Sequence, residues 1–164
     1  MMVQRTLLIV YCIDTSALIN IWRESYPPDV FPGLIKDIED LIDKDLLVAP
    51  SEVLDELKGR DDDLHRWAMA HRRMFKELTA GELENVRRIL GQFPDLIDPN
   101  KTTPDADPFL IALAMDNGWT VVTSERPRGP LGRPRIPDVC RTLGVRCIGL
   151  MDLLRERGWR YERA

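Results

Sequence analysis

The stretch "LLIVYCIDTSALIN", residues 7–20, joins an apolar run to a helical pattern, and a single aspartate, Asp14, stands at the junction. The apolar run is typical of a buried β-strand, which we expect from about Thr6 to Ile13. Thr15 or Ser16 then caps the helix that follows. A carboxylate at the end of a buried strand is costly unless something binds it, so Asp14 is the first candidate for a functional site.

Short apolar runs of this kind recur along the chain, and helical patterns separate them. We expect strands at about residues 6–13, 46–49, 119–123 and 145–150. We expect helices at about residues 16–24, 34–45, 52–59, 62–78, 79–93, 103–118, 136–144 and 151–159. Strands separated by helices are parallel, with helices on both faces. The sequence therefore predicts an α/β fold, a three-layer α/β/α sandwich around a small twisted parallel sheet of about four strands.

Composition describes an ordinary globular chain of 164 residues, 44% hydrophobic and 30% charged, which we interpret as one domain over residues 1–164. The net charge of -4 argues against a general polyanion binder but leaves room for a local basic patch. Cys12, Cys140 and Cys147 are odd in number and contain no CxxC pair, so neither a disulfide framework nor a zinc site is indicated. We expect a reducing, cytoplasmic compartment.

The N-terminus has one feature of a signal peptide, because Arg5 precedes apolar residues. The run is short, lacks a small-residue cleavage site and ends at Asp14, so we do not interpret it as one. No stretch approaches the roughly 20 apolar residues that span a bilayer. We therefore expect no association with a membrane.

Acidic residues gather where the predicted strands end, which is the edge at which parallel sheets bind ligands. Besides Asp14 they are Glu52, Asp55, Glu56, Asp105, Asp107 and Glu125. Carboxylates that converge in one cleft repel one another, and a divalent cation removes that penalty. Oxygen ligands suit Mg²⁺ or Mn²⁺, and such a cation supports hydrolysis of a phosphodiester.

Each acid also has a structural explanation. Asp14 and Asp107 can simply cap helices, and Asp107 precedes a proline at a helix start. Glu56 lies on a helix, where glutamates are usually solvated, and Glu125 lies in a Pro-rich loop that could be ordinary surface. What favours a site is that the sheet topology brings them to one place.

At these residues the chain resembles PIN-domain proteins. The resemblance rests on "CIDTSALI" (12–19), "PSEVLDEL" (50–57) and "ADPFLIALAMDNGWTVVTSE" (106–125), and it extends from Met1 to about Leu150. A bacterial and archaeal branch of PIN-like proteins with little described function is most similar. In that branch Thr-x-Glu ends the third strand, and a later segment resembles "RIPDVCRTLGVRC" (135–147).

The resemblance implies a metal-dependent ribonuclease, often the toxin of a toxin–antitoxin pair. Asp14, Glu56 and Asp107 would bind one or two Mg²⁺ or Mn²⁺ ions as catalytic metal ligands. Glu125, where many PIN domains have aspartate or asparagine, would position a second metal or the attacking water. Behind these ligands would stand Ser16, Thr123 and Asp105.

A loop rich in arginine follows the third predicted strand. Its candidates for binding an RNA substrate are Arg126, Arg128, Arg133 and Arg135. Arginine forks suit phosphate, although any one of these side chains could equally be solvated surface. The amphipathic stretches 34–47 and 67–75 most simply pack on the sheet, and they also allow a homodimer or an antitoxin partner.

Two other classes of function stay open. A haloacid-dehalogenase-like phosphatase or phosphotransferase also has an aspartate after its first strand, but "DTS" lacks the second aspartate of such sites and no lysine follows the third strand. A receiver domain would need adjacent acids before Asp14, where the chain has Tyr11 and Cys12. The other open class is a non-catalytic PIN-fold module that binds RNA or protein. Such a module need not bind Mn²⁺, so Mn²⁺ affinity would distinguish it from a nuclease.

Overall fold

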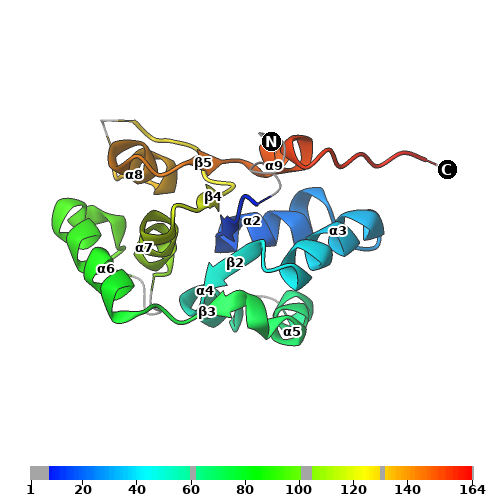
Figure 1. Ribbon diagram of the computed structural model, residues 1–164, viewed down its shortest axis with the longest axis horizontal. Coiled ribbons are helices and arrows are strands. Elements are labelled where there is room, and N and C mark those ends of the chain that lie inside the picture. Colours follow the sequence, from blue (N-terminus) through cyan, green and yellow to red (C-terminus); the bar gives the residue numbers. More distant parts are fainter. Residues whose placement is uncertain (1–7, 60–61, 101–104, 130–131, 164) are drawn as a thin grey trace.

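The computed structural model describes residues 8–59, 62–100, 105–129 and 132–163, and at its centre lies a parallel five-stranded sheet (Figure 1). The strand order is β3-β2-β1-β4-β5, and every neighbouring pair is parallel. The strands are β1 (Tyr11–Ile13), β2 (Leu47–Pro50), β3 (Phe75–Lys76), β4 (Thr120–Val122) and β5 (Cys147–Ile148). Because β1 is central, the residue after it lies in the middle of the carboxyl edge.

Helices connect the strands and cover both faces of the sheet. The α-helices are α2 (Thr15–Ile19), α3 (Pro32–Asp43), α4 (Ser51–Leu57), α5 (Asp62–Ala70), α6 (Ala80–Gln92), α7 (Asp107–Asn117), α8 (Ile136–Leu143) and α9 (Leu150–Glu156). The other helical turns are η1 (Asn20–Ser25), which is π-helical, and the 3₁₀ turns η2 (Arg72–Met74) and η3 (Pro94–Leu96). In Figure 1, α6, α7 and α8 lie on one side of the sheet, with α2, α3 and α9 on the other. The predicted three-layer α/β/α sandwich is thus confirmed.

The period of two along each strand produces two separate cores. In β1, Tyr11 and Ile13 face the core formed with α2, α3, α4, α5 and α9, while Cys12 faces the core formed with α6, α7 and α8. Val122 and Val121 of β4 divide between the same two cores in the same way. Both faces are therefore apolar, which explains why the strands appear in the sequence as continuous apolar runs.

Helix α7 lies between the sheet and α6 and is buried nearly all round, from Pro108 to Ala114. Asp107 opens the helix, and Gly118 ends it in the left-handed conformation with φ 68°. The first turn of the most buried helix thus lies at the carboxyl edge of the sheet. In the described part of the chain, no helix combines the length and apolar character needed to cross a membrane.

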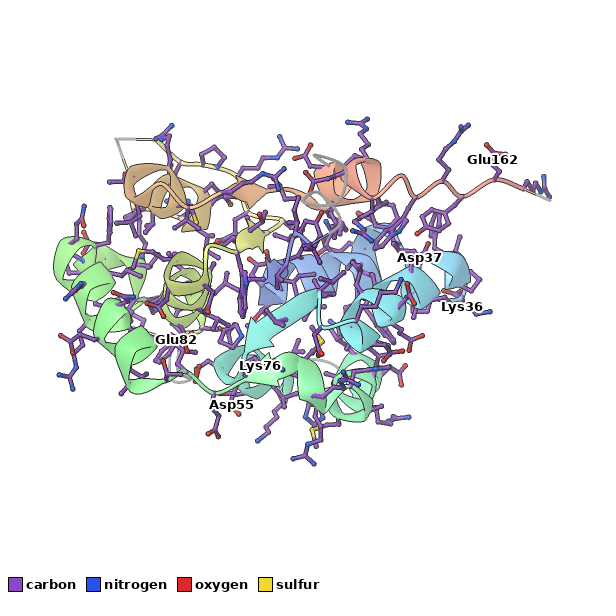
Figure 2. All side chains as sticks on the ribbon, in the orientation of Figure 1. Lys36, Asp37, Asp55, Lys76, Glu82 and Glu162 are labelled. Carbon is purple, nitrogen blue, oxygen red and sulfur yellow. The ribbon has the colours of Figure 1, made fainter. Side chains whose placement is uncertain are left out.

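Helix α6 begins with a capping box formed by Thr79 and Glu82. Thr79 Oγ1 accepts the N–H of Glu82 at 3.2 Å, and Glu82 Oε1 accepts the N–H of Thr79 at 2.8 Å. The other oxygen of Glu82 accepts a hydrogen bond from Asn117 Nδ2 at 2.7 Å, which links α6 to the end of α7. Figure 2 shows Glu82 on the inner side of α6. A charged residue is buried here because its hydrogen bonds are satisfied.

The number of strands and the ends of several elements differ from the prediction. The sheet has five strands rather than about four, because residues 62–78 do not form one helix. Helix α5 ends at Ala70, and Phe75–Lys76 then forms a two-residue edge strand paired with Ala49 and Pro50 of β2. A strand of two residues is too short to show the alternation of apolar and polar residues from which strands are predicted. The helix predicted over 16–24 continues as α2 only to Ile19 and then widens into η1.

The first and last strands in chain order are also shorter than predicted. Regular pairing in the first strand covers Tyr11–Ile13, and the predicted start at Thr6 lies outside the described residues. The last strand covers Cys147–Ile148 instead of 145–150, and the predicted helix start at Thr103 also lies outside the described residues. Boundaries of this kind depend on pairing with neighbouring strands, which the local sequence does not encode.

Candidate functional site

Asp14 lies at the end of β1, where it caps α2 and is only 3% exposed. Its carboxylate accepts hydrogen bonds from Ala17 N–H at 2.7 Å and from the Ser16 hydroxyl at 2.8 and 2.9 Å. Thr123, which follows β4, donates a third at 2.5 Å. The backbone N–H of Asp14 in turn bonds Val122 O at 3.0 Å. The hydroxyls of Ser16 and Thr123 therefore contact the Asp14 carboxylate, as expected of residues that orient a metal ligand.

Burial dominates the electrostatics of Asp14. Desolvation raises the pKa of this carboxyl from 3.8 to about 7, although the hydrogen bonds from Thr123, Ala17 and Ser16 lower it. Nearby Glu125 raises the pKa further. Three donors, Thr123, Ala17 and Ser16, thus favour the anion, while burial and the charge on Glu125 oppose it.

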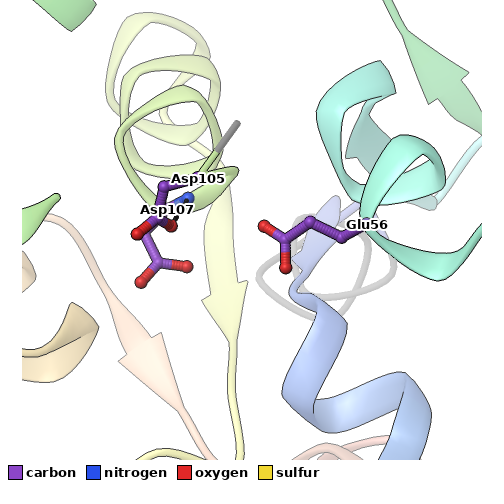
Figure 3. A group of neighbouring side chains, drawn as sticks. All are labelled: Glu56, Asp105 and Asp107. Carbon is purple, nitrogen blue, oxygen red and sulfur yellow. Dashed lines mark hydrogen bonds between the residues drawn. The ribbon is translucent and has the colours of Figure 1, made fainter. Parts of the chain in front are cut away.

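A second group of carboxylates lies where α4 meets the start of α7. Glu56, Asp105 and Asp107 each offer one oxygen, and these oxygens all lie within 4.8 Å of one another. Figure 3 shows the Glu56 carboxylate pointing from α4 toward the two aspartates. Glu56 Oε1 accepts the N–H of Ala106 at 2.6 Å, and Asp105 Oδ1 accepts the N–H of Asp107 at 3.2 Å. The backbone before α7 thus orients two of the three carboxylates.

Mutual repulsion within this group is strong. The pKa of Asp107 rises from 3.8 to about 9, first because of burial and then because of the charges on Asp105, Glu125, Asp14 and Glu56. Asp14, Glu56, Asp107 and Glu125 also line one cleft, so the two groups form one acidic site. A cation bound among them would favour the charged form of each. The donor set contains only oxygen atoms, which fits a hard divalent cation.

The acids line one open cleft of about 420 Å³ at the carboxyl edge of the sheet. Four predicted ligands line it, namely Asp14, Glu56, Asp107 and Glu125. Also lining it are Thr15, Ser16, Ile19, Glu24 and Ser124. The four predicted carboxylates come from the four successive connections between the five strands, and the fold brings them together.

Glu125 is held to the same framework as Asp14. Its N–H donates to Thr123 Oγ1 at 3.0 Å, so one hydroxyl contacts both Asp14 and the backbone of Glu125. The next residue toward the strand, Ser124, donates its N–H to Ser16 Oγ at 3.1 Å and accepts a hydrogen bond from Asn20 Nδ2 at 2.9 Å. The segment after β4 is thereby fixed against α2.

Sequence reasoning missed Glu24 and placed Asp105 differently. Glu24 lies on the π-helical turn η1 and is exposed, yet it lines the cleft. In the sequence, Glu24 is only an acidic residue at the end of the helix that follows Asp14, and such a residue does not by itself indicate a site. Asp105 was predicted behind the ligands, but its oxygen lies directly in the group with Glu56 and Asp107.

The other acids of α4 do not line the cleft. Glu52 accepts a hydrogen bond from Ser51 Oγ at 3.2 Å, and burial raises its pKa. Asp55, labelled in Figure 2, is exposed and pairs with Lys58 at 3.6 Å. Because α4 points only one of its three acids into the cleft, the choice of Glu56 agrees with the geometry.

The arginines divide in a way that the sequence does not reveal. Arg128, Arg133 and Arg135 line a second cavity of about 310 Å³, which shares Asp107 and Glu125 with the acidic cleft. Arg126 is exposed, and among the described cavities it lines neither of these two. Three of the four predicted substrate-binding arginines therefore lie beside the acids.

Comparison with known proteins identifies a family and distantly similar solved structures. The model of a family described as a domain of unknown function (DUF4411) matches residues 11–161. The crystal structure of PAE2754 from Pyrobaculum aerophilum aligns over 83% of this chain and 97% of that one, with 16% identity and a TM-score of 0.39. No curated protein matches the chain.

Proposed function

The chain belongs to the DUF4411 family, a domain of unknown function, and we propose that it is a metal-dependent endoribonuclease. The reaction is hydrolysis of an RNA phosphodiester bond in the acidic cleft. The observation that carries the proposal is the meeting of Glu56, Asp105 and Asp107, whose oxygens lie within 4.8 Å of one another in reach of the charge on Asp14. The expectation that the substrate is RNA comes from the resemblance to PIN domains.

In this proposal Mg²⁺ or Mn²⁺ is held by Asp14, Glu56, Asp105 and Asp107. Such a cation lowers the pKa of a coordinated water and neutralises charge on a phosphate. Thr123 and Ser16 fix the Asp14 carboxylate, and the Ala106 N–H fixes that of Glu56. Ligands held by hydrogen bonds in this way lose little freedom when they bind the cation. Glu125 extends the acidic wall toward the arginines and positions the water or a second cation.

The geometry favours this proposal over an aspartyl-phosphate mechanism. A nucleophilic Asp14 would need an oxygen exposed for attack on the substrate, whereas a metal ligand needs only one lone pair free at the base of the cleft. Both of its oxygens instead accept hydrogen bonds from Ser16, Thr123 or Ala17, and the residue is 3% exposed. Such a carboxylate suits a ligand at the base of a cleft better than an attacking group.

The test is cleavage of labelled single-stranded and hairpin RNAs by the purified chain with Mn²⁺, Mg²⁺ or EDTA. We expect cutting with either metal, none in EDTA, and loss of activity in Asp14→Asn and Asp107→Asn. Asp55→Asn is the matched control, because it removes an exposed carboxylate one residue from Glu56. Folded protein that binds no Mn²⁺ and cuts no RNA would overturn the proposal and favour a binding module.

The toxin role, the antitoxin partner and the homodimer stay predictions that follow from the resemblance and the amphipathic stretches. The cleavage test separates them from the chemistry. A nuclease can cut RNA with or without a partner, so activity of the isolated chain neither requires nor excludes an antitoxin.

A further inference from the structure

The segment 135–147 contains two of the three cysteines, and the fold places them on adjoining elements of one core. Cys140 is fully buried near the end of α8, and the half-buried Cys147 begins β5, the strand at one edge of the sheet. Both pack in the core formed with α6, α7 and α8. Cys140 O accepts the N–H groups of Gly144 and, at 2.9 Å, Val145. This turn brings β5 back against the last turn of α8.

The third cysteine, Cys12, is separated from Cys147 by a whole strand. Val121 of β4 pairs with Cys12 on one side and with Cys147 on the other, so β1 and β5 lie two strand spacings apart, about 10 Å. A disulfide needs Cα atoms within about 7 Å, so these two cysteines cannot join. Among the described residues, the side chains that converge as metal ligands are all acids. Any bond to Cys147 within the chain must therefore come from Cys140.

The thiols of Cys140 and Cys147 are in contact. Cys140 donates a hydrogen bond to the sulfur of Cys147, which lowers the pKa of the Cys147 thiol and raises that of Cys140. The same hydrogen bond outweighs burial and the charges on Asp14 and Glu125, which act in the opposite direction on Cys147. Because the thiolate is the reactive form of cysteine, Cys147 is the thiol of the pair that is prepared to react.

We infer that Cys140 and Cys147 are a modification site, a dithiol that a hydroperoxide converts into a reversible disulfide. The inference does not depend on the proposed ribonuclease function. Disulfides that form inside reducing compartments are usually transient and sense oxidants, which agrees with a pair that is reduced at rest. Sensor cysteines of this kind combine a lowered pKa and access to solvent with a neighbouring thiol that resolves the oxidised form.

Two steps make the disulfide. The Cys147 thiolate attacks one oxygen of hydrogen peroxide, the O–O bond breaks, and the departing hydroxide takes up a proton to become water. Cys147 is thereby oxidised to a sulfenic acid. The Cys140 sulfur then attacks the Cys147 sulfur, the S–O bond breaks, and the leaving hydroxide takes the Cys140 proton to form a second water. In total two thiols are oxidised and one peroxide is reduced to two waters.

The test exposes the full reduced chain to hydrogen peroxide, blocks the remaining thiols with N-ethylmaleimide and digests with trypsin. The sequence suits this test, because cleavage after Arg135, Arg141, Arg146 and Arg155 puts the two cysteines in separate peptides, 136–141 and 147–155. We expect mass spectrometry to find these peptides joined, with Cys12 blocked as a free thiol. Dithiothreitol should release the two peptides, because a disulfide is reversible.

Two variants of Cys140 separate its two roles. Cys140→Ser keeps a hydroxyl that can donate to Cys147 but cannot form a disulfide, so we expect dimedone to trap a lasting sulfenic acid on Cys147. Cys140→Ala also removes the donor, so alkylation of Cys147 by iodoacetamide at neutral pH should be about tenfold slower than in Cys140→Ser. Cys12→Ala is the matched control, and its rate of disulfide formation should stay within about twofold of wild type. Circular dichroism checks that each variant is folded.

Several results would overturn the inference. Peroxide could leave peptides 136–141 and 147–155 unlinked, join either of them to the peptide of Cys12, or link two chains to each other. Equal alkylation rates in Cys140→Ser and Cys140→Ala would show that Cys140 does not activate Cys147. A disulfide that forms as fast in urea as in the folded chain would show that the fold does not prepare the pair, since we expect folding to speed the reaction by at least about tenfold.

Discussion

Thr123 Oγ1 donates a 2.5 Å hydrogen bond to Asp14 Oδ2 and so joins the ends of β4 and β1 across 109 residues of sequence. The same hydroxyl accepts the N–H of Glu125 at 3.0 Å. A single side chain thus orients the acid at the centre of the sheet edge and the backbone of the acid beside it.

Replacing Thr123 with valine tests that contact. Valine keeps the shape and removes the hydroxyl, so the anion of Asp14 loses a donor and its pKa rises further. We expect Mn²⁺ affinity, measured by calorimetry, to fall by about tenfold, as for other groups that orient metal ligands. The control is Thr120→Val at the start of β4, whose hydroxyl accepts a hydrogen bond from Arg146 Nη1 at 3.3 Å and does not line the cleft. Equal affinity in both variants would contradict a role for the Thr123 hydroxyl.

The raised pKa of Asp14 predicts a specific pH dependence for the metal-free protein. In the folded chain the pKa is about 7 instead of 3.8, so the folded state holds a proton that the unfolded state has released. Stability is therefore undiminished below the unfolded pKa, falls as pH rises from about 4 to 7, and stays reduced above that range. Asp107, with a pKa near 9, extends the fall to higher pH.

The measurement is the Tm of wild type minus the Tm of Asp14→Asn in EDTA across that range. Taking the difference cancels carboxylates such as Glu82 and Asp138, whose lowered pKa values give the opposite trend at acid pH. We expect the difference to become more negative as pH rises, and Mn²⁺ to stabilise wild type more at alkaline than at acid pH. A difference that does not change with pH would show that Asp14 stays ionised throughout.

Glu56→Gln separates charge from structure at the meeting of α4 and α7. The amide oxygen of glutamine can still accept the Ala106 N–H, now at 2.6 Å, so the tether between the two elements survives. The metal site loses one anionic ligand, and we expect Mn²⁺ affinity to fall by at least about tenfold with little change in Tm in EDTA. Asp55→Asn serves as the control on the same helix. If Glu56→Gln binds Mn²⁺ as wild type does, Glu56 is not a ligand.

The candidate residues whose location could be predicted are those whose place follows from topology. In a parallel sheet the carboxyl ends of strands share one edge, so Asp14 and Glu125 had to lie near each other once the strands were recognised. Asp107 could be placed because it opens the helix that feeds β4. The hydrophobic periodicity and the order of strands and helices along the chain are enough to predict these locations.

What the sequence did not reveal depends on packing between distant elements. Glu24 reaches the cleft because the helix after Asp14 widens into a π-helical turn, which no local pattern announces. Asp105 joins Glu56 only because α4 lies against the start of α7. The sequence gives no reason to separate Arg126 from Arg128, which lie in the same loop. Only Arg128 lines the second cavity, and its backbone N–H donates to the buried carboxylate of Asp138.

Glu82 allows a test of the fold away from the site. Glu82→Ala removes the capping box with Thr79 and the hydrogen bond from Asn117, so we expect the free energy of unfolding to fall by about 2 kcal/mol. Urea denaturation measures it, and Glu84→Ala on an exposed position of the same helix is the control, expected to cost less than about 0.5 kcal/mol. Equal losses in the two variants would mean that the cap and its link to α7 add nothing.

Glu24 gives the last prediction, because it lines the cleft from an exposed position. Its carboxylate attracts a cation through solvent, so its effect should be weaker than that of Glu56 and should depend on salt. We expect Glu24→Gln to lower Mn²⁺ affinity by about threefold at low ionic strength, and the effect should vanish at high ionic strength. Asp29→Asn, an exposed acid outside the cleft, should leave the affinity unchanged in both conditions. A loss of affinity that survives high salt would instead make Glu24 a direct ligand, held in place by the π-helical turn.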